Sequence, residues 1–454
     1  MERSFQEKNA VPRTASPCEE DTALHSLSVG PGSPVLLQDT ILHETLETFV
    51  HEKLVERAVH AKGFGALGYF LTERSMQEFT TLSFLQTVGR RTPVAARFSL
   101  AAGGPGTPDT SRNIRGFSTK FYAEDGNFDL LCNHIPVFLV RDAIRFPEAI
   151  AALRPSPESG LSSPERFWSF AAQAPEALHF ITWLYSDYGT MKSLRHLPAS
   201  SVNAYVWRDA QGRRRYVKYH WQPVEGAAWL SRQEAVRLAG ENPDIAGQEL
   251  YETIAAGNPA EYRLSVQILD PAAASQLPYH PLDCTKLWDE ERFPLLPVGR
   301  LVLDRNPTDY RQQVEKIAFS PANLLPGAEL SEDKLLQGRS FIYWDAQRYR
   351  LGAGFREIPI NSRRNRAPWS PDSEVTSGIG ETLSGTIERS GLPDPDNFTQ
   401  AGERYRSLPE IEREHLTENI AAELRAVQPD TRSTVLGYFQ KADPELADKI
   451  QEQM

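Results

Sequence analysis

Three short segments of the chain contain residue types that could do chemistry on a small molecule. The first ends in His60, after an amphipathic run that begins near Phe49, and Gly63 and Gly65 follow, which let other groups approach the backbone closely. A histidine in that place can project into a cavity and exchange protons, although a capping or core histidine has the same local pattern. The segment therefore offers a candidate acid–base group.

The second segment places Asn133 beside His134 at the start of an apolar stretch, and the third surrounds Tyr343 with positive charge. Arg339 lies four residues before that phenol and Arg350 seven residues after it. A phenol with its usual pKa of about 10 is a poor anionic ligand, but neighbouring guanidinium groups favour its ionised form. Taken alone, Asn133 is also typical of a turn, and Tyr343 of aromatic packing.

The elements that must position these residues are predicted from periodicity. Apolar spacing predicts helical segments over residues 40–59, 163–196, 223–256 and 397–454. Short strands are expected over residues 62–72, 93–140, 202–207, 215–221 and 262–269. Residues 297–368 show little periodicity, so Tyr343 is expected in a long irregular, wrapping segment. Residues 1–40 are interpreted as a polar arm and residues 369–395 as a flexible stretch.

Composition excludes several classes of function. The 454 residues carry 49 Lys+Arg against 60 Asp+Glu, a net charge of −11, which argues against nucleic acid as the main partner. The longest apolar runs, such as 135–140, are far too short to cross a membrane, and the first twenty residues show no secretory pattern. Three scattered cysteines suit neither a disulfide framework nor a thiolate metal site. A soluble protein of the cytoplasm is expected.

Together the three segments resemble the haem catalases, the monofunctional, tyrosinate-ligated family, in its small-subunit type. Glu56, Arg57, His60 and Gly63 match the distal signature of that family. The proximal signature is matched by Arg339, Phe341, Tyr343, Asp345, Ala346 and Gln347. Further matches in the same order are Arg97-Phe98-Ser99, Arg115-Gly116-Phe117, Arg141-Asp142-Ala143 and Arg305-Asn306-Pro307. The resemblance extends from about residue 30 to the end of the chain.

The resemblance implies an α+β fold built on an eight-stranded antiparallel β-barrel. The N-terminal arm and distal helix would occupy residues 1–61, the barrel with inserted helices 62–304, the wrapping segment 305–394 and the C-terminal helical domain 395–454. It also implies a homotetramer with exchanged arms. The implied reaction is haem-dependent disproportionation of hydrogen peroxide to water and dioxygen through a ferryl intermediate.

The resemblance further implies a role for each matched residue. Tyr343 would be the axial ligand of the haem iron, as in catalases generally, and Arg339 would keep it deprotonated. His60 would move protons between the peroxide oxygens, Asn133 would donate a hydrogen bond to bound peroxide, and Ser99 would bond the ring of His60. The other implied haem contacts are the propionate-binding Arg57, Arg97 and Arg350, the neighbouring Val59, and the apolar Phe117, Phe138 and Phe146.

Some positions depart from the family along the expected route of peroxide. Ala101 and Asn113 stand where the family usually has Val and Asp, and Ile135 lies in a stretch that is usually polar. We expect these changes to alter peroxide entry and to lower the turnover rate. His51 occupies a position that is basic in the distal signature and is not expected to be catalytic, and Cys132 is expected to be a buried strand residue.

The surface site at which many members of the family store NADPH is also altered. Tyr188 and Gln222 replace an Arg and a Lys that would hold the nucleotide phosphates. Pro198 and Glu290 replace an Asn and a His, whereas His179, Ser186 and Trp288 keep the family's identity. The sequence therefore predicts that the protein carries haem but no NADPH.

Two other functions stay open. A catalase-like protein can act as a haem peroxidase or rearrange a bulky organic hydroperoxide, but rearranging relatives tend to have Thr directly before the distal His, where this chain has Val59. A haem carrier or sensor without turnover would have no need of the pair His60 and Asn133. Evolution of oxygen from added peroxide separates these alternatives.

Overall fold

The computed structural model describes residues 24–51, 56–362, 385–392 and 395–454. Most of the expected arm (1–40) and of the expected flexible stretch (369–395) lies outside these residues. The boundaries predicted between the four parts of the chain stay predictions.

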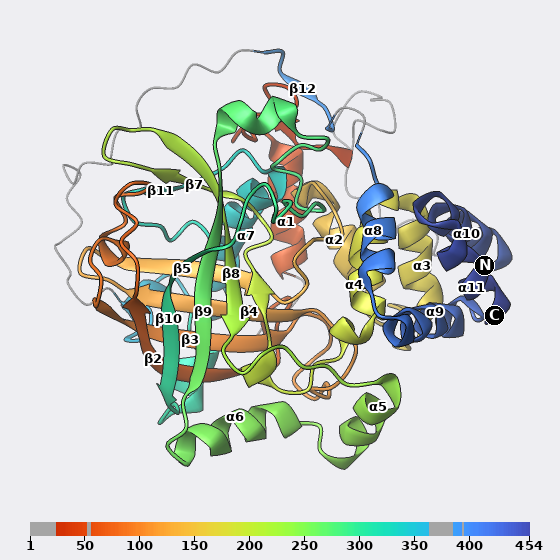
Figure 1. Ribbon diagram of the computed structural model, residues 1–454, viewed down its shortest axis with the longest axis horizontal. Coiled ribbons are helices and arrows are strands. Elements are labelled where there is room, and N and C mark those ends of the chain that lie inside the picture. The colour runs from red at the N-terminus through yellow and green to blue at the C-terminus, as the bar shows by residue number, and fades with distance from the viewer. Residues whose placement is uncertain (1–23, 52–55, 363–384, 393–394) are drawn as a thin grey trace, which may run out of the picture.

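Eight strands close an antiparallel β-barrel at the centre of the described chain (Figure 1). Neighbouring strands follow the order β2-β3-β4-β5-β6-β8 on one side and β2-β10-β9 on the other, and pairing of β8 with β9 closes the ring. The barrel strands are β2 (Gly63–Thr72), β3 (Arg91–Leu100), β4 (Arg115–Tyr122), β5 (Asn127–Asn133), β6 (Ala199–Ser200), β8 (Arg214–Pro223), β9 (Ala260–Leu269) and β10 (Leu296–Arg305). The other strands are β1 (Leu27–Ser28), β7 (Tyr205–Arg208), β11 (Ala328–Leu330) and β12 (Glu388–Arg389). The α+β fold and the barrel expected from the sequence are confirmed.

The barrel is filled by aromatic side chains and is a packed core. Phe98 of β3 stacks on Phe117 of β4 with ring centroids 4.4 Å apart, and Trp221 and Tyr262 lie 5.6 and 4.8 Å from the ring of Phe117. Because successive side chains of a strand point to opposite faces, the residues on either side of Phe117 point out of the barrel. This outer face of β3, β4 and β5 carries the polar side chains considered below.

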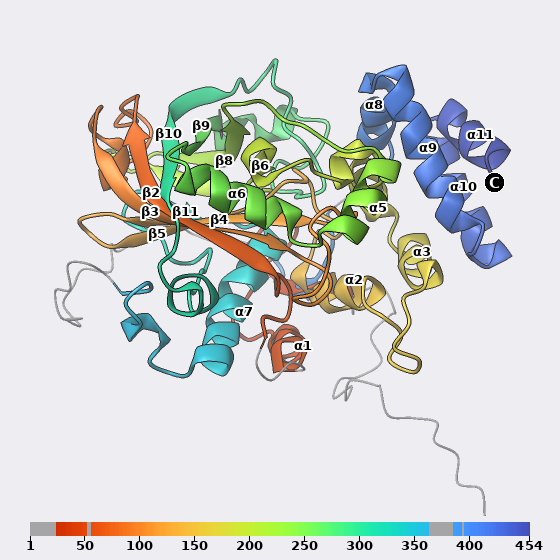
Figure 2. The ribbon, with the colours of Figure 1, turned by 90° about the horizontal axis from the view of Figure 1, so that it is seen from below.

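Helices surround the barrel. The helices are α1 (Thr40–His51), α2 (Phe146–Ala152), α3 (Pro164–Gln173), α4 (Leu178–Tyr185), α5 (Arg232–Glu241), α6 (Ile245–Ala255), α7 (Lys334–Leu351), α8 (Thr399–Ser407), α9 (Glu410–Leu424), α10 (Pro429–Ala442) and α11 (Pro444–Glu452). Among them, α6 contacts β9 and β10. The helices α8 to α11 pack beside α3 and α4 at one end of the molecule, as expected for the C-terminal segment (Figure 1). The helices α1 and α7 lie side by side on the outer face of the barrel (Figure 2).

The prediction of an irregular segment around Tyr343 is wrong, because Tyr343 lies in the regular helix α7. The carboxylate of Asp333 caps its first turn by accepting hydrogen bonds from the amides of Leu335 and Leu336 at 2.9 and 3.2 Å. Gly352 ends it in a left-handed conformation, with a φ of 84°. Polar side chains such as Arg339 and Gln347 lie among the apolar ones on the inner side of α7, and this mixture hides the apolar periodicity that identifies a helix in a sequence.

The helix predicted over residues 40–59 is shorter in the structure. The helix α1 ends at His51, and residues 56–60 are not helical. His60 therefore lies in the loop that leads into β2, rather than on a helix.

Candidate functional site

One cavity lies between the outer face of the barrel and the helices α1 and α7, with about 1190 Å³ of space free of protein atoms when its solvent-open part is included. The barrel contributes outward side chains of β3, β4 and β5, and α7 contributes residues spaced three or four apart, which share one face of a helix. The residues predicted for the site that line this cavity are Arg57, Val59, His60, Arg97, Ser99, Asn133, Phe138, Phe146, Arg339, Tyr343 and Arg350. The fold thus brings together residues up to nearly three hundred positions apart.

Phe117 is the exception and corrects the prediction. Gly116 and Ser118 line the cavity, so the alternation of the strand turns the intervening side chain of Phe117 into the barrel. There it is fully buried against Phe98 and Tyr262. Phe117 supports the barrel wall from behind and does not line the cavity.

His60 is held in an unusual conformation at the cavity wall. Its φ is 62°, a left-handed value that costs a non-glycine residue energy. Its amide donates a hydrogen bond to the carbonyl oxygen of Ala101 at 3.1 Å, and its Nδ1 lies 2.9 Å from Oγ of Ser99. Gly116 makes room for the ring, because a Cβ there would lie 2.8 Å from Cε1 of His60. The site fixes both the backbone and the ring of this histidine.

The electrostatic surroundings keep the imidazole of His60 neutral. Burial, followed by the positive charges of Arg97 and Arg339, lowers the pKa of His60 to about 3. A neutral imidazole can accept a proton from a bound substrate, which an imidazolium cannot.

On the helical wall, Tyr343 is approached by a guanidinium group that is itself anchored. Nη2 of Arg339 donates to the phenol oxygen of Tyr343 at 3.4 Å, and Nη1 donates to Oδ1 of Asn203 at 2.5 Å. Asn203 in turn donates to Oδ2 of Asp333 at 2.7 Å. Burial alone would lower the pKa of Arg339, but Tyr343 and Tyr205 outweigh it, so this pKa is raised. Arg339 therefore stays charged beside the phenol.

Three arginines cluster at one edge of the cavity. Arg57 donates to the backbone oxygens of residues 314, 315 and 317 at 2.8 to 3.1 Å, and Arg350 donates to those of residues 315 and 317 at 2.5 and 3.1 Å. Arg97 donates to the backbone oxygens of His60 and Ala61, both at 3.0 Å. The nearest carboxylate is that of Glu315, 3.2 Å from Arg57 and 3.7 Å from Arg97.

This cluster carries more positive charge than its surroundings neutralise. Burial lowers the pKa of all three arginines, and repulsion from Arg57 adds to the effect on Arg97 and Arg350. The pKa of Arg350 falls to about 9. Nε of Arg97 is buried with no hydrogen-bond partner among the described residues. Such a set of donors fits one or more carboxylates of a bound ligand.

Asn133 lies at the end of β5, and its side-chain amide has no hydrogen-bond partner within the described parts of the chain. It is available to a molecule bound in the cavity. Phe138 and Phe146 provide an apolar wall, with ring centroids 6.1 Å apart.

The residues expected to alter peroxide entry are engaged elsewhere. Asn113 accepts a hydrogen bond from the amide of Ala102 at 3.0 Å and donates to its carbonyl oxygen at 2.9 Å. Ala101, Asn113 and Ile135 are buried and are not among the residues that line the cavity. Asn113 therefore clamps the backbone next to Ala101, and the expected effect on peroxide entry stays a prediction.

A second cavity holds most of the residues assigned to the nucleotide site of the family. It is lined by His179, Tyr188, Pro198, Gln222, Trp288 and Glu290, while Ser186 is buried nearby. Of its two cations, Lys286 donates to the carbonyl oxygen of Asp396, and the guanidinium of Arg404 lies 3.9 Å from the ring of Trp183. Nε of Arg404 is buried without a hydrogen-bond partner among the described residues. His134 reaches this cavity but is fully buried, with both ring nitrogens hydrogen bonded to backbone groups.

Comparison with known proteins agrees with this architecture. The family "Catalase" matches residues 13–379, and "Catalase-related immune-responsive" matches residues 392–454. Catalase-1 of Arabidopsis thaliana is 38% identical over 94% of this chain and 92% of its own, and a catalase of Vibrio parahaemolyticus is 36% identical over 94% and 90%. The solved structure of catalase A from Saccharomyces cerevisiae superimposes with a TM-score of 0.82 at 31% identity, covering 94% of this chain and 95% of that one.

The fold and the relatives thus define the class, and the chain belongs to the catalase family. It is an enzyme with catalase function, and the substrate of this family is hydrogen peroxide. No helix in the described parts of the chain is both long and apolar enough to span a membrane.

The sequence did not reveal Asn203 or Glu315 as part of the site. Asn203 reaches Arg339 from the loop before β7, and Glu315 reaches the arginines from a π-helical turn (Arg311–Glu315). Neither residue lies in a segment with a chemical pattern of its own, so only the tertiary contacts identify them.

Proposed function

We propose that the protein disproportionates two molecules of hydrogen peroxide to two of water and one of dioxygen in a tyrosinate-ligated haem site. The observation that carries the proposal is that a single cavity has the pair His60 and Ser99 on its barrel wall and the pair Arg339 and Tyr343 on its helical wall. These pairs would serve as an acid–base group and an anionic ligand.

The residues present fit a haem. Its two propionates would satisfy the unpartnered Nε of Arg97 and offset the charges of Arg57 and Arg350, whose pKa values burial lowers despite the nearby carboxylate of Glu315. The apolar wall of Phe138 and Phe146 suits a flat macrocycle, and Tyr343 would hold the iron. When bound, the haem would supply iron that accepts oxidising equivalents from one peroxide and returns them to a second.

The chain's own side chains would move the proton and orient the peroxide. Because Nδ1 of His60 lies 2.9 Å from Oγ of Ser99, its Nε2 is the atom left to take a proton from one peroxide oxygen and give it to the other. The free amide of Asn133 would donate to the peroxide and stabilise the charge that develops as its O–O bond breaks. Arg339 would keep the phenol of Tyr343 ionised through its positive charge.

The variant Tyr343→Phe tests this proposal. It removes the oxygen that would ligate the iron and keeps the ring, so we expect loss of the Soret band and of oxygen evolution from peroxide. The matched control is Tyr251→Phe, which removes a phenol oxygen from the exposed face of α6. If the Tyr343→Phe protein evolves oxygen at the wild-type rate per haem, Tyr343 is not the iron ligand. If the wild-type protein converts organic hydroperoxides but evolves no oxygen from hydrogen peroxide, the proposed reaction is wrong.

We further propose that the second cavity does not hold NADPH. Its lining has more carboxylates than cations, so a polyanionic dinucleotide would meet an unfavourable field. The carboxylates are those of Asp289, Glu290, Asp396 and Glu403, and the cations are Lys286 and Arg404. The protein is purified, denatured and assayed for reduced nicotinamide nucleotide by fluorescence. One equivalent per chain contradicts the proposal.

We also propose a homotetramer of the small-subunit type that works in the cytoplasm. The support is the family resemblance, together with Cys132 and Cys284, which are free and buried, as suits a reducing compartment. Light scattering on the eluting protein should give four times the chain mass of 51.0 kDa. A dimer or monomer mass contradicts the tetramer, and a secreted protein in cell fractionation contradicts the compartment.

A further inference from the structure

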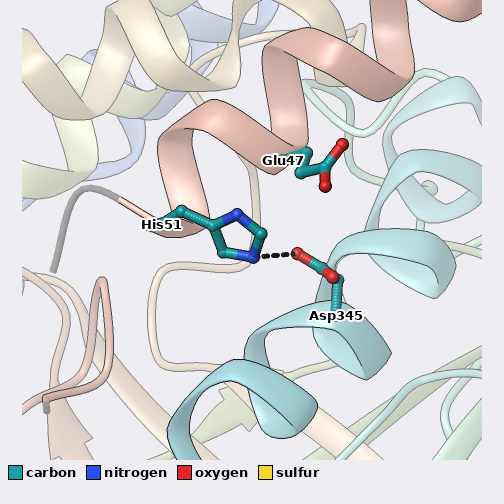
Figure 3. Close-up of side chains that lie close together, drawn as sticks. All are labelled: Glu47, His51 and Asp345. Atoms are coloured by element: carbon teal, nitrogen blue, oxygen red, sulfur yellow. Dashed lines mark ion pairs between the residues drawn. The ribbon is translucent and has the colours of Figure 1, made fainter. Parts of the chain in front are cut away.

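Outside the cavity, three potential metal ligands meet where α1 packs against α7. Glu47 and His51 are four residues apart on α1 and therefore share one face of that helix, and Asp345 faces them from α7 (Figure 3). One ligand atom from each of these side chains lies within 4.8 Å of the other two. Two carboxylates and one imidazole are ligand types that Zn²⁺ and similar divalent ions accept.

Asp345 and His51 form an ion pair between the two helices (Figure 3). Oδ2 of Asp345 is shielded from solvent, yet it has no hydrogen-bond partner among the described residues. It lies 3.0 Å from Nε2 of His51 without the alignment of a hydrogen bond. The side chain of Asp345 is 23% exposed, so a divalent ion can reach this pair and be held between the carboxylate and the imidazole, which are both metal-ligand types.

The spacing of the atoms suits a metal. Ligands at about 2.0 to 2.2 Å from one zinc ion lie about 3 to 4 Å from each other. The separation of 3.0 Å between Asp345 and His51 is already near this range. The exposed side chain of Glu47 can turn to close the remaining gap. The ring of His51 is also oriented by Tyr349, whose ring centroid lies 4.5 Å away.

We propose that Glu47, His51 and Asp345 bind a divalent transition-metal ion of the Zn²⁺ type, with water completing the coordination. Neither the family assignment nor the reaction requires this site. Its position gives it a structural consequence: Leu46 of α1 and Ala346 of α7, which adjoin two of the ligands, both line the main cavity. A bound ion would tie together the two helices that wall that cavity.

Equilibrium dialysis of the tag-free holoenzyme against Zn²⁺, read by elemental analysis, tests the proposal. We expect each chain to bind one Zn²⁺ ion saturably, and we expect the affinity of Glu47→Gln for Zn²⁺ to be lower by at least about tenfold. Loss of a group that only hydrogen bonds a metal ligand costs about ten- to a hundredfold in affinity, and loss of a direct ligand should cost no less. The control Glu44→Gln removes the same charge from an exposed position one turn earlier on α1 and should bind like wild type.

Two further readouts do not depend on enzyme activity. X-ray absorption at the zinc edge should show only nitrogen and oxygen neighbours, one of them an imidazole, and the haem iron does not interfere at that energy. Zn²⁺ should raise the melting temperature of wild type and Glu44→Gln more than that of Glu47→Gln. Absence of saturable binding up to millimolar Zn²⁺, or equal affinity of Glu47→Gln and Glu44→Gln, overturns the proposal.

Discussion

Replacing Gly116 by alanine tests the idea that a fixed imidazole drives the reaction. The new Cβ would lie 2.8 Å from Cε1 of His60, 2.9 Å from its Nδ1 and 2.9 Å from Oγ of Ser99, whereas ordinary contacts begin at 3.4 Å. Gly116 pairs with Ser99 of β3 and with Asn133 of β5, so its backbone is held on both sides. The ring must therefore retreat, and the bond between His60 and Ser99 must lengthen or break.

The displacement sets the size of the effect. Lengthening the 2.8 Å contact to 3.4 Å moves the ring by at least about 0.6 Å, and a misplacement on the order of 1 Å costs on the order of 10²-fold in rate when a catalytic group must be aligned with its substrate. We therefore expect kcat for hydrogen peroxide to fall about 10²-fold in Gly116→Ala, while the haem content stays near that of wild type because Tyr343 and the arginines are untouched.

The assay is initial oxygen evolution at several peroxide concentrations, normalised to haem by the Soret absorbance. The matched control is Gly104→Ala, whose Cβ would meet nothing within 4 Å. If Gly116→Ala keeps the wild-type kcat with a full complement of haem, the position of the imidazole does not limit the rate, and the role assigned to His60 is refuted.

Three further outcomes follow from the pKa values and hydrogen bonds. Because the pKa of His60 is lowered to about 3, kcat should be flat from about pH 5 to 9; an inflection near 6.5 in an oxygen-electrode profile would contradict a neutral, buried base. Burial also lowers the pKa of His179 to about 3 and that of His220 to about 4, whereas both are about 6.5 in the unfolded chain. The folded protein should therefore be fully stable above about pH 6.5 and lose stability as the pH falls toward 3, because the unfolded chain binds the protons. A melting temperature that stays constant from about pH 7 to 4 would argue against this. Asn113→Asp should lose about 1–3 kcal/mol of stability because the donor to the carbonyl of Ala102 becomes an acceptor, and an unchanged urea midpoint would disprove the clamp.

The chemistry at the two walls of the cavity could be predicted from the sequence. The two patterns that indicate it are local: His60 with the glycines that follow it, and Tyr343 between Arg339 and Arg350. A local pattern can be recognised without knowledge of the fold. Most strand segments were predicted for the same reason, since alternation and turn residues are properties of neighbours in the chain. The barrel strand β10 was missed, because it lies in the stretch that was expected to be irregular. The helix around Tyr343 was missed because polar and apolar side chains mix on its inner side.

Tertiary structure alone decided which of these residues meet and what surrounds them. The direction of the Phe117 side chain depends on the register of β4. Arg339 is anchored by Asn203, which lies 136 residues away in the chain. His51 meets Asp345 only because α1 packs against α7. Each is a contact between segments that are remote in the chain, and it exists only because the barrel closes and fixes its outer face opposite two helices. Burial in that arrangement also sets the protonation of the imidazole, since desolvation depends on all the atoms packed around a group and not on its neighbours in the sequence.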